Sequence, residues 1–171
     1  MTNAFGLWRG IALTDNFGEY LSDAQLDFVI GHELAHVKGR HTRKQFTVVL
    51  LVFVALAALF SRLSPLTAVF RPICVLIVLL VPLLVIYSIS RYFEYSCDRK
   101  AVEFTDDPEA GLHALVSLYR MTGSPIACGR IVELFMTHPS LTNRLGAITR
   151  AAGIPVSRAS AVLTEEGLQS R

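Results

Sequence analysis

Two histidines and a glutamate stand at metal-binding spacing in the motif H-E-x-x-H, at residues 32–36. On a helix, residues four apart lie about 40° apart around the axis, so the imidazoles of His32 and His36 can face one metal ion. Glu33 lies one step further round and can reach a water bound to that ion. This arrangement is typical of sites in which zinc activates a water for hydrolysis.

The residues around the motif predict the helix that this geometry needs. Ser22 is a good N-cap, and Gln25, three residues later, completes a capping box. Apolar residues then recur at spacings of three and four, which predicts a helix over residues 22–39, or longer, with one apolar stripe. The residues of the stripe are Leu26, Val29, Ile30, Leu34 and Val37.

The composition indicates a membrane protein. The 171 residues are 52% hydrophobic and only 18% charged, whereas about 25% of a soluble domain is usually charged. Residues 46–60 and 72–90 carry no charge, and the short link over residues 61–71 predicts that they form a helical membrane hairpin. The alternative is a pair of core helices in a soluble protein, but the rest of the chain is too small to bury both.

A membrane hairpin returns the chain to the side of the bilayer that it left. Seven lysines and arginines lie in the flanks of the hairpin and two lie in its turn. By the positive-inside rule, the flanks face the cytoplasm.

A catalytic zinc needs a third protein ligand. His41 lies five residues past His36 and is expected to face away from it on a continuous helix, while His113 and His138 lie in the later part of the chain. Glu94 is the better candidate, because it begins the helix that leaves the membrane and therefore emerges beside the H-E-x-x-H helix.

Asp98 follows Glu94 on the same helix face. We expect its carboxylate to accept a hydrogen bond from a ligand histidine and so to orient it. The alternative is a surface carboxylate paired with Arg91 or Arg99.

Four segments together resemble the HtpX and CAAX prenyl endopeptidase family of membrane zinc metallopeptidases, which are of the gluzincin type. The matching segments are Asn3-Ala4-Phe5, the stretch from Leu21 to Val37, Glu94-Tyr95-Ser96-Cys97-Asp98 with Ala101, and Thr137-His138-Pro139-Ser140 with Arg144. The resemblance runs from residue 3 to about residue 148. Family members usually carry a portion before the Asn-Ala-Phe strand that this sequence does not contain, so we expect the sheet to be one strand short.

The resemblance implies a role for each matching residue. Zn²⁺ would be held by His32, His36 and Glu94, with Glu33 as the general base. His138 would stabilise the oxyanion, together with or instead of Arg144; alternatively, His138 is a loop histidine and Arg144 a buried structural cation. The strand that contains Asn3, Ala4 and Phe5 would pair with an extended substrate backbone, unless it is an ordinary edge strand.

The predicted fold is mostly α with a small N-terminal β-hairpin (α+β). The membrane hairpin is inserted between the two zinc-ligand helices of a zincin-like domain. Residues 1–45 would hold the β-hairpin and the catalytic helix, 46–90 the two transmembrane helices, 91–152 the C-terminal helical part, and 153–171 a weakly patterned tail. Within the C-terminal part we expect helices over 108–121, 131–136 and 141–152.

These features predict an integral membrane zinc endopeptidase with its active site facing the cytoplasm. Its partners would be protein or peptide substrates and the lipid bilayer. A net charge of +2 does not argue for nucleic acid. The alternatives are a truncated zinc-binding relative without activity, a membrane scaffold with incidental histidines, and a soluble metalloprotease whose apolar segments form a core hairpin.

Overall fold

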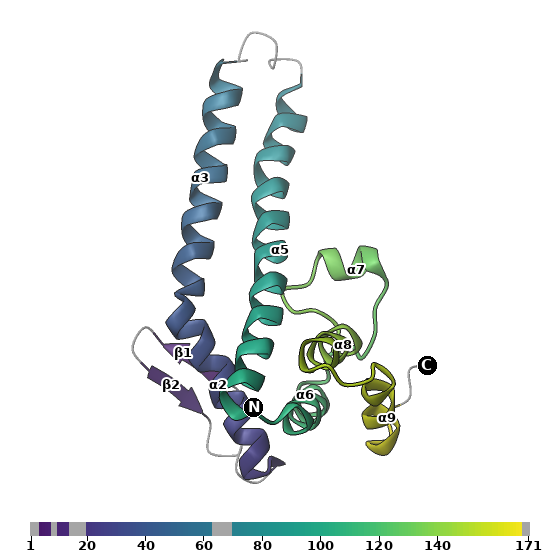
Figure 1. Cartoon of the computed structure of the whole chain (residues 1–171). Coiled ribbons are helices and arrows are strands. Elements are labelled where there is room, and N and C mark those ends of the chain that lie inside the picture. The colour runs from purple at the N-terminus through teal and green to yellow at the C-terminus, as the bar shows by residue number, and fades with distance from the viewer. Residues whose placement is uncertain (1–3, 8–9, 14–19, 63–69, 169–171) are drawn as a thin grey trace.

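The chain is mostly helical. The computed structural model describes residues 4–7, 10–13, 20–62 and 70–168, which contain seven helices and two strands. Strand β1 (Ala4–Leu7) pairs antiparallel with β2 (Gly10–Leu13), with Ala4 opposite Leu13. The sequence predicts a hairpin over these residues, and the two strands lie beside the base of the helical pair in Figure 1.

Helix α2 (Asp23–Gly39) carries the H-E-x-x-H motif, and its start confirms the predicted capping box. The Ser22 backbone N–H donates to the Gln25 side chain at 3.0 Å, and the Gln25 backbone N–H donates to the Ser22 hydroxyl at 3.4 Å. The helix ends at Gly39 because Arg40 adopts a left-handed conformation with φ 51°. The following helix therefore starts in a new direction.

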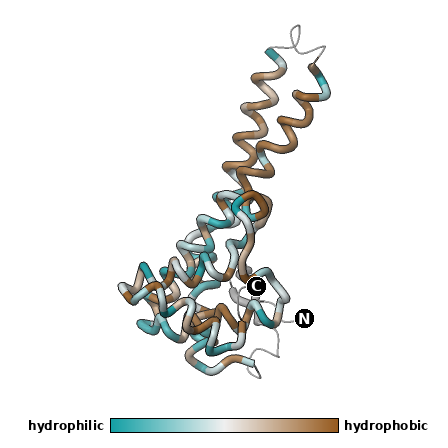
Figure 2. The backbone as a smooth tube through the Cα atoms, turned by 90° about the vertical axis from the view of Figure 1, so that its right-hand side faces the viewer, coloured by the Kyte–Doolittle hydropathy of each residue, from teal (hydrophilic) through white to brown (hydrophobic). Residues whose placement is uncertain are grey.

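Two long helices, α3 (His41–Arg62) and α5 (Arg71–Thr105), project as an antiparallel pair from the rest of the chain (Figure 1). They contain the two predicted apolar stretches, and both are long and apolar enough to cross a membrane. Their most apolar 18-residue windows are 0% and 6% buried, and Figure 2 shows the hydrophobic residues continuing along both helices. Within the described residues, these windows are therefore not packed as a core, and the two helices are candidate membrane spans.

A polar contact joins the bases of the two long helices. The Gln45 amide of α3 donates to the Ser90 hydroxyl of α5 at 2.6 Å and to the Ile86 carbonyl at 3.2 Å. Side-chain hydrogen bonds of this kind hold apolar helices together where burial of apolar surface provides no drive. The contact fixes where α5 returns beside α3.

The remaining helices form a compact group beside the lower half of α5 (Figure 1). They are α6 (Pro108–Thr122), α7 (Arg130–Leu134), α8 (Leu141–Ala152) and α9 (Ser157–Glu165). The helices predicted over 108–121, 131–136 and 141–152 correspond to α6, α7 and α8. The tail contains α9, which the sequence pattern did not predict; it packs Val162 and Leu163 into the core.

A single hydrophobic cluster lies below the apolar pair and holds α2, α5, α6, α8 and α9 together. Phe28 of α2 is fully buried against α6, where a Cβ at Gly111 would lie 2.7 Å from its ring. A Cβ at Gly31 would lie 3.4 Å from the Ala101 backbone of α5, so α2 and α5 approach closely one residue before His32. Packing of small residues thus places the motif beside α5.

We predict that the full chain stays in the membrane pellet after alkaline carbonate extraction. Leu51→Arg and Leu79→Arg place a charge on positions that are 63% exposed in each long helix, and a central arginine opposes insertion by about 2.5–3.5 kcal/mol. Both variants should shift protein to the supernatant. Val156→Arg, on an exposed site outside the pair, is the control; release of the unmodified chain would contradict the prediction.

Candidate metal centre

His32 and His36 of α2 and Glu94 of α5 converge on one point. The Nε2 atoms of the two histidines lie 3.2 Å apart. Glu94 Oε1 lies 3.4 Å from His36 Nε2, and Glu94 Oε2 lies 3.7 Å from His32 Nε2. Glu94 and His32 are buried, and His36 is half-buried.

The spacing and chemistry of these three groups fit a zinc ion. Ligand nitrogen and oxygen atoms lie about 2.0–2.1 Å from zinc, so two corners of a tetrahedron are separated by about 3.3–3.4 Å. The separations lie near that value: 3.2 Å between the two imidazole nitrogens, and 3.4 and 3.7 Å from these nitrogens to Oε1 and Oε2 of Glu94 respectively. Two imidazoles and one carboxylate leave a fourth position for water, as in catalytic zinc sites.

A buried ion-pair network holds the carboxylates of α5 in place. Arg144 of α8 donates from Nε to Asp98 Oδ2 at 2.8 Å and from Nη2 to Asp98 Oδ1. Its Nη1 lies 3.3 Å from Glu94 Oε2. Asp98 in turn lies 2.9 Å from His32 Nδ1. The structure therefore places Asp98 against His32 and Arg144, and the alternative, a surface pairing with Arg91 or Arg99, is absent from the described ion pairs.

The network sets the protonation of these groups, which lie beyond the apolar stretch 72–90. Burial alone would raise the pKa of Glu94, but Arg144, His138 and His36 outweigh burial and hold that pKa well below 4.5. Burial would also raise the pKa of Asp98, but Arg144 and His32 outweigh burial and hold that pKa below its ordinary value of 3.8. At a pH above their ordinary pKa values, both ionised carboxylates therefore stabilise the fold. This stabilisation is lost as the pH falls through the lowered pKa values that the two groups have in the folded chain.

Burial lowers the pKa of His32, but Asp98 and Glu94 reverse that effect and raise it above 6.5. Metal binding requires a neutral imidazole, so an ion would displace this proton. The negative charge around His32 thus favours either a proton or a cation at the centre.

His138 approaches the same carboxylate from a loop. Its Nδ1 lies 3.1 Å from Glu94 Oε2, although its side chain is 63% exposed. The buried Tyr119 hydroxyl donates to the Pro139 carbonyl and holds the loop from behind. Arg91 holds the segment just before it by donating to the carbonyls of Glu133, Leu134 and Met136.

A pocket of about 200 Å³ opens beside this centre. Its lining includes His36, Glu94, Thr137 and His138 from the centre and the loop, and His41, Thr42, Gln45, Ser90 and Phe93 from the bases of the long helices. The pocket therefore extends from His36 and Glu94 of the centre to the bases of the apolar helical pair.

Glu33 lies next to His32 on α2 and is half-buried. Among the ion pairs of the described residues, none involves Glu33. Its carboxylate is therefore not committed to a structural contact there.

The sequence-based expectation for His41 was wrong. On one helix, residues five apart face about 140° apart, but the left-handed Arg40 breaks the helix between His36 and His41. His41 Nδ1 consequently lies 3.3 Å from His36 Nδ1 and 3.4 Å from the Cys97 sulfur. Cys97 was also missed, although its position three residues after Glu94 places it on the same side of α5.

His113, a further histidine of the later part of the chain, is not part of the centre. His113 pairs with Glu166 at 3.1 Å, between α6 and the segment after α9. Asn3 lies outside the described residues, and only the backbone of Ala4 and Phe5 is described, in β1. The expected substrate-pairing role of these three residues stays a prediction.

Comparison with known proteins identifies the family. The profile of peptidase family M48 matches residues 1–152 of this chain. The chain belongs to peptidase family M48. Peptidases of family M48 depend on zinc, which agrees with the donor set of His32, His36 and Glu94.

Relatives of the chain within family M48 include proteins named protease HtpX homolog. One from Polynucleobacter necessarius is 29% identical over 188 aligned residues, covering 88% of this chain and 64% of the relative. Another, from Moorella thermoacetica, is 30% identical over 194 residues, covering 88% and 62%. This chain thus spans less than two thirds of the length of these relatives. No solved structure matches it.

Removing Arg144 tests the buried network. Arg144→Met would leave two buried carboxylates without their cation, and breaking a buried ion pair from one side costs about 3–5 kcal/mol. We expect a correspondingly lower free energy of unfolding for the metal-free chain, measured by thermal unfolding in detergent.

Arg158→Met is the matched control for this prediction. Arg158 also pairs with two carboxylates, those of Glu109 and Glu165, but its side chain is 29% exposed, whereas that of Arg144 is 8% exposed, so a much smaller change is expected. Equal stability of the Arg144→Met and native chains would show that the network does not hold the centre.

Proposed function

We propose that this chain is a membrane-bound zinc endopeptidase that hydrolyses peptide bonds in membrane or membrane-adjacent proteins. Membership of family M48 supports a peptidase. The observation that carries the proposal is the convergence of His32, His36 and Glu94 at separations of 3.2–3.7 Å. This is the spacing of three ligands around one zinc.

The roles follow from the positions of the side chains. His32, His36 and Glu94 would hold the zinc, which when bound lowers the pKa of a water and polarises the scissile carbonyl. Glu33, whose carboxylate makes no described ion pair, takes a proton from the attacking water. It delivers that proton to the nitrogen of the leaving amine as the carbon–nitrogen bond breaks.

His138 is proposed to stabilise the oxyanion that develops on the carbonyl oxygen. Its exposed ring borders the pocket, and its Nδ1 is anchored on Glu94 Oε2. Arg144 is bound by Asp98 and Glu94 and is only 7% exposed. We therefore assign Arg144 to positioning the carboxylates, and the oxyanion to His138.

The class of substrate follows from the distance to the bilayer. We propose that residues 46–60 and 72–90 span the membrane as two helices in a zincin-like domain, with the centre on the cytoplasmic side. Glu94 lies four residues beyond residue 90, or about 6 Å along the helix. The pocket is lined partly by Gln45 and Ser90, at the bases of the same helices. Substrates tethered to the membrane would reach it most readily.

Glu33→Gln should abolish peptide cleavage while the chain still binds zinc, because the amide cannot accept the proton of the water but leaves the three ligands in place. General acid–base groups contribute about 10²–10⁴-fold to rates. Cleavage would be measured on one peptide sequence, either free or attached to a lipid anchor in vesicles, and zinc by metal analysis of the same preparation.

The control variant is Glu103→Gln, which removes an exposed carboxylate of α5 and should change nothing. The native chain should cleave the anchored peptide faster than the free one. Zinc binding without cleavage by the native chain would favour an inactive relative. Equal cleavage of free and anchored peptides would remove the argument for membrane-tethered substrates.

A further inference from the structure

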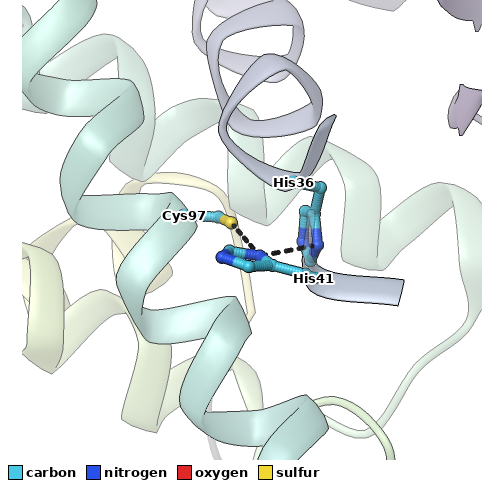
Figure 3. A group of neighbouring side chains, drawn as sticks. All are labelled: His36, His41 and Cys97. Atoms are coloured by element: carbon cyan, nitrogen blue, oxygen red, sulfur yellow. Dashed lines mark hydrogen bonds between the residues drawn. The ribbon is translucent and has the colours of Figure 1, made fainter. Parts of the chain in front are cut away.

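A second group of metal-binding side chains lies on the far side of the His36 ring. His36 directs Nε2 towards Glu94 and Nδ1 towards His41, whose Nδ1 is 3.3 Å away. The Cys97 sulfur lies 3.4 Å from the same His41 nitrogen. Figure 3 shows the three side chains pointing towards one another from α2, the start of α3 and α5. His41 and Cys97 are 5% and 0% exposed.

The fold holds the His41 ring in this orientation from both sides. The ring stacks on Phe93 with centroids 4.0 Å apart and planes 3° apart. On its other edge, a Cβ at position 39 would lie 2.2 Å from His41 Nε2, so the ring occupies space that only a glycine leaves open. With Nε2 against Gly39, only Nδ1 is directed towards His36 and Cys97.

The three donor atoms have the spacing of a metal site. Zinc lies about 2.0–2.1 Å from imidazole nitrogen and about 2.3 Å from thiolate sulfur, so tetrahedral ligands lie about 3.3 Å apart for two nitrogens and about 3.6 Å apart for nitrogen and sulfur. The separations of 3.3 and 3.4 Å agree with these values. All three donors lie within 4.8 Å of one another.

We propose that His36, His41 and Cys97 bind a second transition-metal ion of the zinc or cobalt class, at a site that shares His36 with the proposed zinc centre. A thiolate with two imidazoles favours these metals over magnesium or calcium. The ion enters through the pocket that His36 and His41 line. Binding releases the thiol proton of Cys97 and the proton on His36 Nδ1 to solvent, so that the His36 ring bridges the two ions.

A second ion at this site would also affect the proposed peptidase function. Two divalent cations on opposite nitrogens of one imidazole ring repel each other, so the second ion would weaken binding of the first. Zinc in excess of one equivalent should therefore lower the peptidase activity of the native chain, and Cys97→Ser should remove that inhibition.

Cobalt is the probe that tests the site directly, because a thiolate bound to cobalt gives an intense near-ultraviolet charge-transfer band that nitrogen and oxygen ligands do not. Metal-free full-length chain in detergent would be titrated with cobalt. We expect two bound equivalents and a charge-transfer band. In Cys97→Ser the band should vanish and binding should fall to one equivalent. His41→Phe, which keeps an aromatic ring against Phe93, should have the same effect.

The chain supplies matched controls. Cys128→Ser removes a thiol that contacts Met136 in a different part of the fold. This variant should still bind two equivalents of cobalt and show the charge-transfer band. Glu94→Gln should lose the cobalt at the proposed catalytic centre but keep the band, so failure of the peptidase proposal is distinguishable. If the native protein showed no charge-transfer band with cobalt, Cys97, His41 and His36 would be joined by hydrogen bonds only, and the proposal would be overturned. A band that persists in Cys97→Ser would also overturn the proposal.

Discussion

The buried carboxylates of Glu94 and Asp98 are the constraint on which the centre depends. Two negative charges on one helix face cannot be buried without compensation, because the loss of hydration is costly. Arg144 provides one positive charge and contacts both carboxylates, and His32 contacts Asp98. The one remaining negative charge is balanced by a proton on His32 or by a cation between the histidines and Glu94. The arrangement of charge is thus compatible with a bound metal independently of the motif.

The apolar helical pair makes this arrangement possible. α2 and α5 are separated in sequence by the whole of α3 and the turn, yet they pack most extensively against each other. Gly31 permits the close approach to Ala101, and Gln45 ties the base of α3 to Ser90 of α5. The α8 helix then closes the centre from the opposite side by delivering Arg144. All these contacts lie at one end of the helical pair, so the site is built directly on the bases of the apolar helices.

Local signals in the sequence were enough to predict much of this structure. The Ser22–Gln25 capping box fixes where α2 begins, and the uncharged stretches define the cores of α3 and α5. The position of Glu94 could be predicted from the topology, because a hairpin must return its second helix beside the first. Only the family resemblance singled out Arg144, with a buried structural cation as one of its two roles, because nothing local shows that a helix 46 residues later points its guanidinium at Asp98. His41 was misplaced because one left-handed residue, Arg40, changes the helical phase. The tail helix α9 has too weak a pattern to be predicted, and packing on α6 and α8 stabilises it.

The zinc affinity of a Glu94→Gln chain tests the central claim most directly. The measurement belongs in a Cys97→Ser background, so that only the His32, His36 and Glu94 ligands contribute, with Glu103→Gln as the control on the same helix. The account predicts that the Cys97→Ser chain binds one zinc, that Glu103→Gln leaves this unchanged, and that Glu94→Gln loses it in competition with a weak chelator. Unchanged zinc affinity in the Glu94→Gln chain would contradict the account.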